Sequence, residues 1–180
     1  LQHLKELYAC GDCGIDDDGI KDLKYLEKLK AGWNDEIKNV NHLQHLKELD
    51  AYGDCGIDDD GMKDLKCLEK LNASYNPKIK NVNHLQHLKE LDASGYYCGI
   101  NDEGIKDLKF LEKLNASNNP KIKNVNHLQH LKELDVSGHC GIDDNGMKDL
   151  KYLERLNSRF NQKIKNVNHL QHLKELDASG

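Results

Sequence analysis

The sequence has little of several residue types and lacks a long apolar segment. It contains two Pro, two Met, two Phe and one Trp among 180 residues, and aromatic residues make up only 6% of the chain. No apolar run approaches the roughly 18–20 residues that a membrane-spanning helix needs, and no signal-peptide pattern is present. We therefore expect no membrane partner. The hydrophobic fraction of 37%, which is regularly placed, also argues against a disordered chain.

A basic surplus and catalytic motifs are missing as well. The 26 Lys and Arg residues are outnumbered by 31 Asp and Glu residues, which gives a formal net charge of −5. This balance argues against a protein that binds a phosphate backbone, so no nucleic-acid partner is expected. The sequence has no Ser-His-Asp set, nucleophile elbow or phosphate-binding loop. It thus predicts a protein that is not an enzyme and uses no cofactor.

What the chain has in abundance is leucine, arranged in a repeating pattern. The heptapeptide LQHLKEL begins at Leu1, Leu43, Leu85, Leu128 and Leu170. A related heptapeptide, LK-x-LE-[K/R]-L, begins between them at Leu23, Leu65, Leu108 and Leu150. The chain is therefore interpreted as a tandem array of coils of 20 to 23 residues that alternate between two types.

We call the coils that start with LQHLKEL type A and the others type B. The type A coils are residues 1–22, 43–64, 85–107, 128–149 and, in part, 170–180. The type B coils are residues 23–42, 65–84, 108–127 and 150–169. Residues 1–180 thus form a single repeat array, and the partial last coil suggests a fragment of a longer chain.

This period, with Leu at a spacing of three, resembles the leucine-rich repeat superfamily. Type A coils, with the pattern LKELDASG-x-CGIDDDGI, are similar to the cysteine-containing class known from F-box proteins. Type B coils, with the pattern LEKLNASYNPKIKNVNHL, are similar to the short class seen in internalins. The positions that match the turn cysteine of the first class are Cys13, Cys55, Cys98 and Cys140. Those that match the asparagine ladder of the second are Asn34, Asn76, Asn119 and Asn161.

The resemblance implies a repeat solenoid of the α/β or mainly β class. It has a parallel β-sheet on the concave face, with turns, 3₁₀ pieces or short helices on the convex face. We expect nine short strands, which start near Leu7, Leu29, Leu49, Leu71, Leu91, Leu114, Leu134, Leu156 and Leu176. The cysteines and asparagines are expected to form buried structural ladders that satisfy backbone groups. Because side chains alternate along a strand, Leu29 should point inward and Lys28 and Lys30 toward the concave face.

Alternating charges follow the predicted stack of coils. Stacked parallel strands place equivalent residues about 4.7–4.9 Å apart. One row would contain Glu6, Lys28, Glu48, Lys70, Glu90, Lys113, Glu133, Arg155 and Glu175. A second row would begin with Lys5, Glu27, Lys47 and Glu69, and a third with Asp18, Lys38, Asp60 and Lys80. We expect these rows to fix the register, because a slip by one coil would align like charges.

Recurring His-x-x-His pairs, such as His42 and His45, invite a metal-binding interpretation. In the stacked array, however, like histidines lie two coils or roughly 10 Å apart, which is too far to share one ion. His42 would share its row with Asp22 and His45 with Tyr25. We therefore predict structural rows and no metal site. The acidic run 16–18 lacks the alternating spacing of a calcium loop and is interpreted as a helix cap.

The cysteines are predicted to be free. The periodic cysteines are two coils apart, which is beyond the limit of about 7 Å between the Cα atoms of a disulfide. Cys10 forms a CxxC motif with Cys13, but it stands in a variable column, so we interpret the motif as a coincidence rather than a redox site. Free cysteines fit a reducing compartment. With no signal-peptide pattern in this sequence, a cytoplasmic location is the expectation.

Differences between the coils concentrate in a few columns on or beside the predicted strand face. Aromatic and Arg side chains, which are favoured at interface hot spots, fall mostly in these columns. The candidate partner-binding residues are Tyr8, Trp33, Tyr52, Tyr75, Tyr96, Tyr97, His139, Arg159 and Phe160. Other coils carry Ser, Asn, Asp or Gly at the matching positions, so the fold does not need an aromatic side chain there.

The predicted function is a non-enzymatic scaffold that binds a protein of unknown identity through the concave sheet and its rim. This rests on the resemblance, since leucine-rich repeats serve mostly in protein recognition. One alternative is a secreted or surface-displayed adhesin or effector, used as internalins are. Another is a metal-binding or purely structural array. End-to-end self-association is also expected, because no polar cap covers the ends of the stack.

Overall fold

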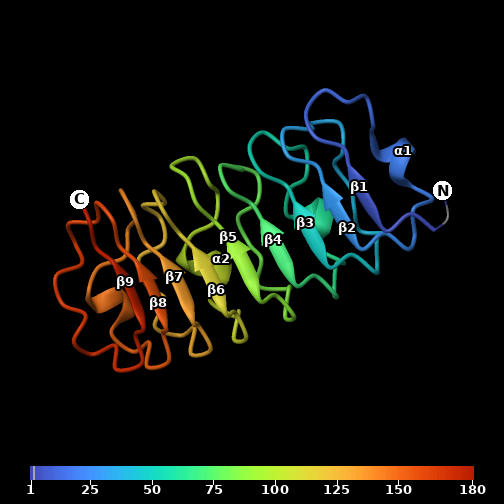
Figure 1. Ribbon diagram of the computed structural model, residues 1–180. Helices are drawn as coiled ribbons and strands as arrows, with labels where there is room; N and C mark the ends of the chain where they lie inside the picture. The colour runs from blue at the N-terminus through green and yellow to red at the C-terminus, as the bar shows by residue number, and fades with distance from the viewer. Residues whose placement is uncertain (2) are drawn as a thin grey trace.

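The computed structural model describes Leu1 and residues 3–180 (Figure 1). Within these residues, nine strands of three residues each form one parallel sheet whose strand order follows the chain. The strands are β1 Glu6–Tyr8, β2 Lys28–Lys30, β3 Glu48–Asp50, β4 Lys70–Asn72, β5 Glu90–Asp92, β6 Lys113–Asn115, β7 Glu133–Asp135, β8 Arg155–Asn157 and β9 Glu175–Asp177. The predicted solenoid with a parallel sheet is confirmed, and each strand begins one residue before the expected leucine.

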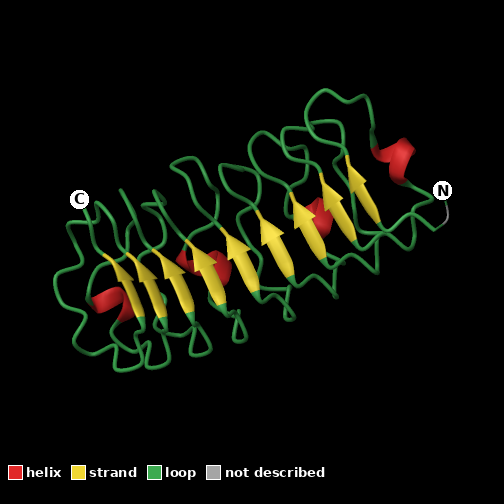
Figure 2. Ribbon diagram, viewed as in Figure 1, coloured by secondary structure: helices red, strands yellow, loops and turns green. Residues whose placement is uncertain are grey.

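Turns and very short helices form the side of the solenoid that faces away from the sheet (Figure 2). The helices are α1 Asp17–Ile20, η1 Asp60–Met62, α2 Asp102–Ile105 and η2 Asn145–Met147. Before each helix, an Asp or Asn side chain accepts a hydrogen bond from the backbone N–H of the residue three positions later. The Asp16 carboxylate, for example, accepts the N–H of Gly19 at 2.9 Å. The acidic run is thus a helix cap, as predicted. No helix of the described residues has the length and apolar character of a membrane span.

Leucine side chains from every coil stack into one continuous core. In β4, Leu71 and the following Ala73 are buried, whereas Lys70 and Asn72 face outward. Burying one Leu side chain stabilises the fold by about 1.5–3 kcal/mol. A single coil is too thin to bury this face, so stability comes from stacking against neighbouring coils.

Buried asparagines tie each type B coil to the type A coil before it. The Asn119 Nδ2 group donates to the carbonyl oxygens of Ala93 at 2.8 Å and Ile100 at 3.1 Å, both in the preceding coil. Its Oδ1 atom accepts the backbone N–H of Lys121 at 2.9 Å. Corresponding bonds are made by Asn34, Asn76 and Asn161. The predicted asparagine ladder is therefore confirmed.

Aspartates on the convex side form a second set of ties between coils. The Asp59 Oδ1 atom accepts the backbone N–H groups of Lys80 at 2.7 Å and Asn81 at 3.1 Å, both in the next coil. The same arrangement recurs at Asp17, Asp102 and Asp144. These bonds satisfy N–H groups in turns that have no strand or helix partner.

The cysteine ladder is present in three of its four predicted members. Cys55, Cys98 and Cys140 are fully buried, and burial raises the pKa of each thiol to about 11. Cys13 was expected to be buried too, but it is exposed. The reason is its place in the first coil, where no coil of the described chain stacks on its outer side. All six cysteines are free.

The two charge rows beside the strands follow the predicted register, but the third row does not. Glu6 lies opposite Lys28 and Lys28 opposite Glu48 in the paired strands. On the convex side, however, Asp18 pairs with Lys21 of its own coil at 3.2 Å. Asp60 and Glu103 make equivalent pairs with Lys63 and Lys106. The ion pairs predicted for a third row across coils are replaced by pairs within each coil, because a lysine three residues later, directly after the helix, is within reach.

Replacing Asn119 with Ala should destabilise the protein by ~3–5 kcal/mol, since it leaves two carbonyl groups and one N–H group without partners. Chemical denaturation measures this change. The control is Lys109→Ala, an exposed position in the same coil, which should stay within about 0.5 kcal/mol of the parent. Equal effects of the two substitutions would contradict the role assigned to the ladder.

Thiol labelling should separate the cysteines into two classes. Cys10, Cys13 and Cys67 are exposed and should react within minutes in the native protein, whereas the three buried thiols should react only on unfolding. Burial keeps these thiols protonated to about pH 11, while unfolded thiols ionise near pH 9. Their contribution to stability is therefore complete below pH 9 and is lost as the pH rises through 11. Mass spectrometry after brief alkylation checks the classes, and rapid native labelling of Cys98 would contradict them.

Candidate binding groove and aromatic rim

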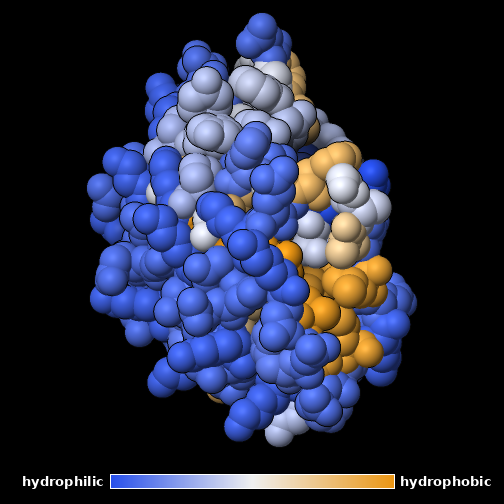
Figure 3. All heavy atoms as spheres, turned by 90° about the vertical axis from the view of Figure 1, so that its left-hand side faces the viewer, coloured by the Kyte–Doolittle hydropathy of each residue, from blue (hydrophilic) through white to orange (hydrophobic). Residues whose placement is uncertain are grey.

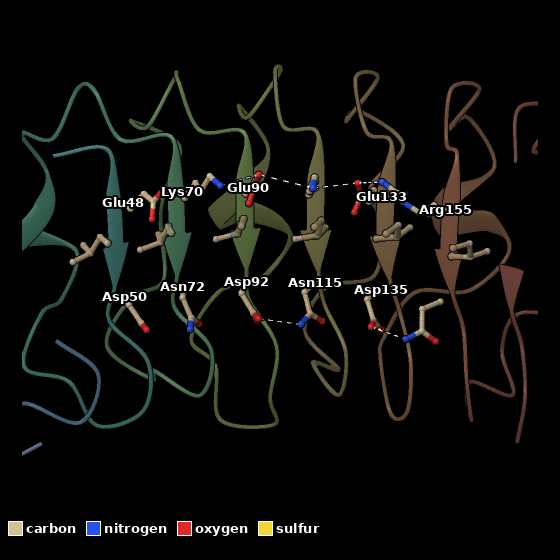
Figure 4. Close-up of a pocket in the computed structure, with 18 of the residues that line it drawn as sticks. Glu48, Asp50, Lys70, Asn72, Glu90, Asp92, Asn115, Glu133, Asp135 and Arg155 are labelled. Atoms are coloured by element: carbon tan, nitrogen blue, oxygen red, sulfur yellow. Dashed lines mark hydrogen bonds and ion pairs between the residues drawn. The ribbon is translucent and has the colours of Figure 1, made fainter. Parts of the chain in front are cut away.

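A shallow groove runs along the concave face of the sheet (Figure 4). It is lined by side chains of the strands from β2 to β9, in rows that run across the strands. The first row consists of the first residue of each strand, and the second row consists of the third residue. The leucine between them, which is buried in β2 to β8, forms the floor. The groove is therefore built from the most regular part of the repeat.

In the first row, the charges of neighbouring coils neutralise each other in ion pairs. Lys28 lies 2.9 Å from Glu48, and Lys113 lies 3.2 Å from Glu133. The hydrogen bond from Lys28 holds the pKa of Glu48 below its usual value. Because these side chains are partly exposed, each pair contributes about 0–1 kcal/mol. Their main effect is to set the register and leave this row without net charge.

The second row is acidic. Its aspartates alternate with asparagines, and Asn115 donates to Asp92 at 3.0 Å. Burial raises the pKa of Asp50, and the negative charge of Asp92 raises it further. Lys30 is the single cation of this row among the described strands. The four aspartates of the row are Asp50, Asp92, Asp135 and Asp177. The centre of the groove thus carries net negative charge.

Aromatic side chains stand beside the groove in an unusual backbone conformation. Trp33, Tyr75 and Phe160 have φ angles of 59°, 57° and 57°, in the left-handed region. Large side chains are rarely found there and are strained by about 1–3 kcal/mol. Asn118 occupies the same position of its coil with φ 56°, and Asn is among the residues that tolerate this conformation best. The backbone of the coil therefore favours Asn or Gly at this position.

Glycines of the type A coils lie under these aromatic rings. A Cβ atom on Gly53 would lie 2.6 Å from the Trp33 ring, and one on Gly95 would lie 2.7 Å from the Tyr75 ring. Both glycines also have positive φ angles. Each ring is thus covered on one side by a coil and open to solvent on the other. Trp33 and Tyr75 remain 49% and 48% exposed.

The structure brings some of the predicted partner-binding residues together. Trp33 contacts Tyr52 edge to face, with ring centroids 5.9 Å apart. Tyr96 and His139 have centroids 6.3 Å apart. The Arg159 guanidinium lies 5.5 Å from the Phe160 ring. We call these residues, with Tyr75 and Tyr97, the aromatic rim: Trp33, Tyr52, Tyr75, Tyr96, Tyr97, His139, Arg159 and Phe160.

Tyr8 lies apart from the rim, on the first strand of the sheet. Its ring is 60% exposed, and its hydroxyl donates to Glu6 at 3.1 Å. The Lys30 ammonium lies 5.1 Å from the ring centroid. Tyr8 therefore borders the strand face itself, at the outer strand, whereas the rim residues follow the ends of the strands.

A second set of exposed aromatics lies before the strands. Tyr25, Phe110 and Tyr152 are 51%, 56% and 58% exposed. Tyr25 stacks on His45 at 5.5 Å, and the other two make similar contacts with His130 and His172. The sequence places these residues in one row but gives them only a structural role. Their exposure adds a surface that sequence reasoning missed, because a repeat pattern shows stacking but not solvent access.

Three of the four histidines in the His42 row contact the backbone of the preceding coil. His42 Nε2 lies 3.1 Å from the carbonyl oxygen of Ile20, and His84 and His127 make equivalent contacts with Met62 and Ile105. In the part of the chain that the structure describes, no three His, Cys, Asp or Glu side chains gather as metal ligands would. The geometry gives these histidines a role in joining coils.

Comparisons with known proteins give structural but not sequence relatives. No protein-family model matches the chain, and no curated protein matches it. Internalin C2 from Listeria monocytogenes is similar with a TM-score of 0.57 and 21% identity, over 88% of this chain and 83% of that chain. A chain of the yeast Rad7–Elc1 complex has a TM-score of 0.65 and 16% identity, over 97% of this chain and 54% of that chain. The TLR13–ssRNA13 complex matches with a TM-score of 0.57 and 24% identity, over 90% of this chain and 26% of that chain. The TM-scores show a shared fold, and at identities below 25% they show the fold alone.

Replacing Tyr75 with Asn should leave the thermal stability unchanged or slightly higher, within about 1 kcal/mol, because Asn relieves the left-handed strain while the ring contacts are lost. Thermal unfolding measures this. The contrasting control is Leu71→Ala in the core of the same coil, which should cost about 2–5 kcal/mol. A loss for Tyr75→Asn as large as that for Leu71→Ala would show that the ring is part of the packing.

Proposed function

We propose that this protein, which has the leucine-rich repeat fold, is a non-enzymatic scaffold that binds a protein partner through the groove and the aromatic rim. The partner would lie across several coils, with its contacts along the strand face and over the rim. The function uses side chains that vary between coils, while the invariant leucines and asparagines build the support. Solved structures of the same fold include complexes with protein, such as Rad7–Elc1 and RP105/MD-1.

One observation carries the proposal. The side chains of Trp33, Tyr75 and Phe160 are about half exposed or more and occupy a backbone position that disfavours them. Strain of this kind persists where function requires it. Selection for stability alone would favour Asn or Gly at all of these positions. One coil does carry Asn at this position, which is Asn118. The exposed aromatics are therefore better explained by recognition than by packing.

The chemistry of the surface sets expectations for the partner. Aromatic and Arg side chains give most of the binding energy at protein interfaces, so the rim should contact apolar or planar groups of the partner. The acidic second row of the groove favours Lys or Arg side chains opposite it. A partner with both features would match the two parts of the surface at once.

The test compares matched variants against one purified partner. The partner is first captured from an extract of the source cells and identified, and its affinity is then measured by calorimetry. Trp33→Asn and Tyr75→Asn should each weaken binding by about 2 kcal/mol or more, roughly thirtyfold. Tyr152→Asn, at an exposed Tyr outside the rim, is the control and should leave the affinity unchanged.

Two results would overturn the proposal. One is an affinity that is unchanged in both rim variants, which would place the interface elsewhere. The other is an equal loss in the Tyr152 control, which would show that any exposed ring has the same effect. Because both rim variants should melt like the parent, a loss of binding cannot be ascribed to unfolding.

A further inference from the structure

The acidic row of the groove repeats every two coils rather than every coil. Its aspartates come from type A strands, and an asparagine of a type B strand lies between each pair of them (Figure 4). The interior members are Asp50, Asp92 and Asp135, with Asn72 and Asn115 between them. Neighbouring parallel strands lie about 4.7–4.9 Å apart, so successive aspartates are separated by about 9.4–9.8 Å. The negative charges of the groove thus have a fixed spacing.

The aromatic rim follows the same two-coil period. Trp33 and Tyr75 each stand three residues after the second-row residue of a type B strand, and Phe160 has the same place in a later type B coil. Asn118 occupies this position in the coil between Tyr75 and Phe160. The rings therefore border the acidic row on the side where the strands end. A ligand that lies along the row passes the carboxylates and the rings together.

The floor of the groove offers little apolar surface to a ligand. Leu71, Leu91 and Leu114 are only 2%, 3% and 2% exposed. In a space-filling view from the side of β9, hydrophilic residues also cover most of the visible face (Figure 3). A ligand in the groove is therefore held by its charges and by contacts with the rim, rather than by burial against the leucines.

The spacing of the acidic row discriminates between the conformations of a bound peptide. In polyproline II, with three residues per turn, every third side chain points the same way at intervals of about 9.3 Å. An α-helix repeats a face after seven residues, or about 10.5 Å. Over two intervals of the row, polyproline II is out of step by about 0.2–1 Å and an α-helix by about 1.4–2.2 Å. An extended strand places side chains of one face about 6.6–6.8 Å apart, so neighbouring ones cannot both face an aspartate.

The chemistry of the rim agrees with the spacing. Proline-rich segments in polyproline II bind in grooves that are lined by aromatic side chains, and their preformed backbone loses little entropy on binding. The rings of Trp33 and Tyr75, which are about half exposed, supply such a lining. The aspartates add a requirement for positive charge opposite them. Conformation and charge thus specify one class of ligand.

We propose that the groove binds a basic, proline-rich peptide segment in the polyproline II conformation, with Lys or Arg at every third residue. The basic side chains pair with the aspartates of the type A strands, and prolines between them contact the rim. Because such a segment belongs to a protein partner, the proposal rests on the function proposed above and makes the partner specific.

Two synthetic peptides of equal charge test the spacing. One contains three Lys-Pro-Pro units and the other three Lys-Pro-Pro-Pro units, in which the lysines are about 12.4 Å apart and point in different directions. Both carry blocked ends, and their affinities are measured by fluorescence anisotropy at low salt, where exposed charges are least screened. The first peptide should bind the parent at least about fivefold more tightly, because it makes at least one more ion pair.

A charge exchange within the row provides the matched variant. Asp92→Asn combined with Asn115→Asp moves the middle carboxylate by one coil and leaves the net charge unchanged. An amide still lies beside a carboxylate, so the hydrogen bond that Asn115 donates to Asp92 at 3.0 Å is reversed rather than lost. The variant should bind the Lys-Pro-Pro peptide about fivefold more weakly and the other peptide within about twofold of the parent. Thermal unfolding checks that the variant is folded.

A control separates spacing from overall charge. Asp107 is exposed and does not line the groove, so Asp107→Asn removes one negative charge elsewhere on the molecule. This variant should bind both peptides within about twofold of the parent, because exposed charges more than a Debye length away are largely screened.

Several results would overturn the proposal. They are equal affinity of the parent for the two peptides, no binding of either, or an undiminished preference in the exchanged variant. Tighter binding of a helical peptide with lysines at every seventh residue would overturn it as well. A failure of the spacing test alone would leave the scaffold function in place. Unchanged partner affinity in both Trp33→Asn and Tyr75→Asn would instead overturn that function.

Discussion

Hydrogen bonds from Asn and Asp side chains to the backbone of a neighbouring coil are the interactions on which the rest of this structure depends. The coil changes direction every few residues, so its turns cannot satisfy their own N–H and C=O groups. Asn76 bonds the carbonyl oxygens of Ala51 and Ile57 from inside, and Asp59 accepts two N–H groups of the next coil from outside. Leucine burial supplies the driving force for stacking, but these bonds fix the shape of the coil and thereby position the groove.

Alternating charge adds direction to a stack that would otherwise be uniform. The leucine core is nearly the same in every coil and does not by itself distinguish one register from another. Ion pairs such as Lys28 with Glu48 contribute little stability individually, but a slip by one coil would turn each of them into a repulsion. The same alternation leaves the first row of the groove neutral and the second row acidic.

Much of this fold could be predicted from the sequence because the sequence repeats. Stacked coils bring equivalent positions of successive repeats together. Aligning the repeats is therefore enough to predict the strands, the asparagine ladder that includes Asn34, and two of the charge rows. The burial predicted for Cys13 was wrong, because among the described residues no coil stacks on the outer side of the first coil. The left-handed backbone at Trp33 was missed, although a signal exists: the same column holds Asn118, and glycines occupy it in the type A coils. Asp17 accepts two backbone N–H groups of the next coil. The sequence gives no signal of this role beyond the recurrence of an aspartate at the same position of the type A coils.

Hydrogen exchange at two convex amides tests most directly whether side-chain bonds between coils hold the structure. Lys80 and Asn81 are exposed, and both of their N–H groups donate to the Asp59 carboxylate. We predict that both amides exchange slowly in the parent, nearly as fast as free turns in Asp59→Ala, and slowly again in Asp59→Asn, which keeps an acceptor oxygen. Rapid exchange of both amides in the parent would contradict the account, because the ties would then contribute nothing to holding the coils together.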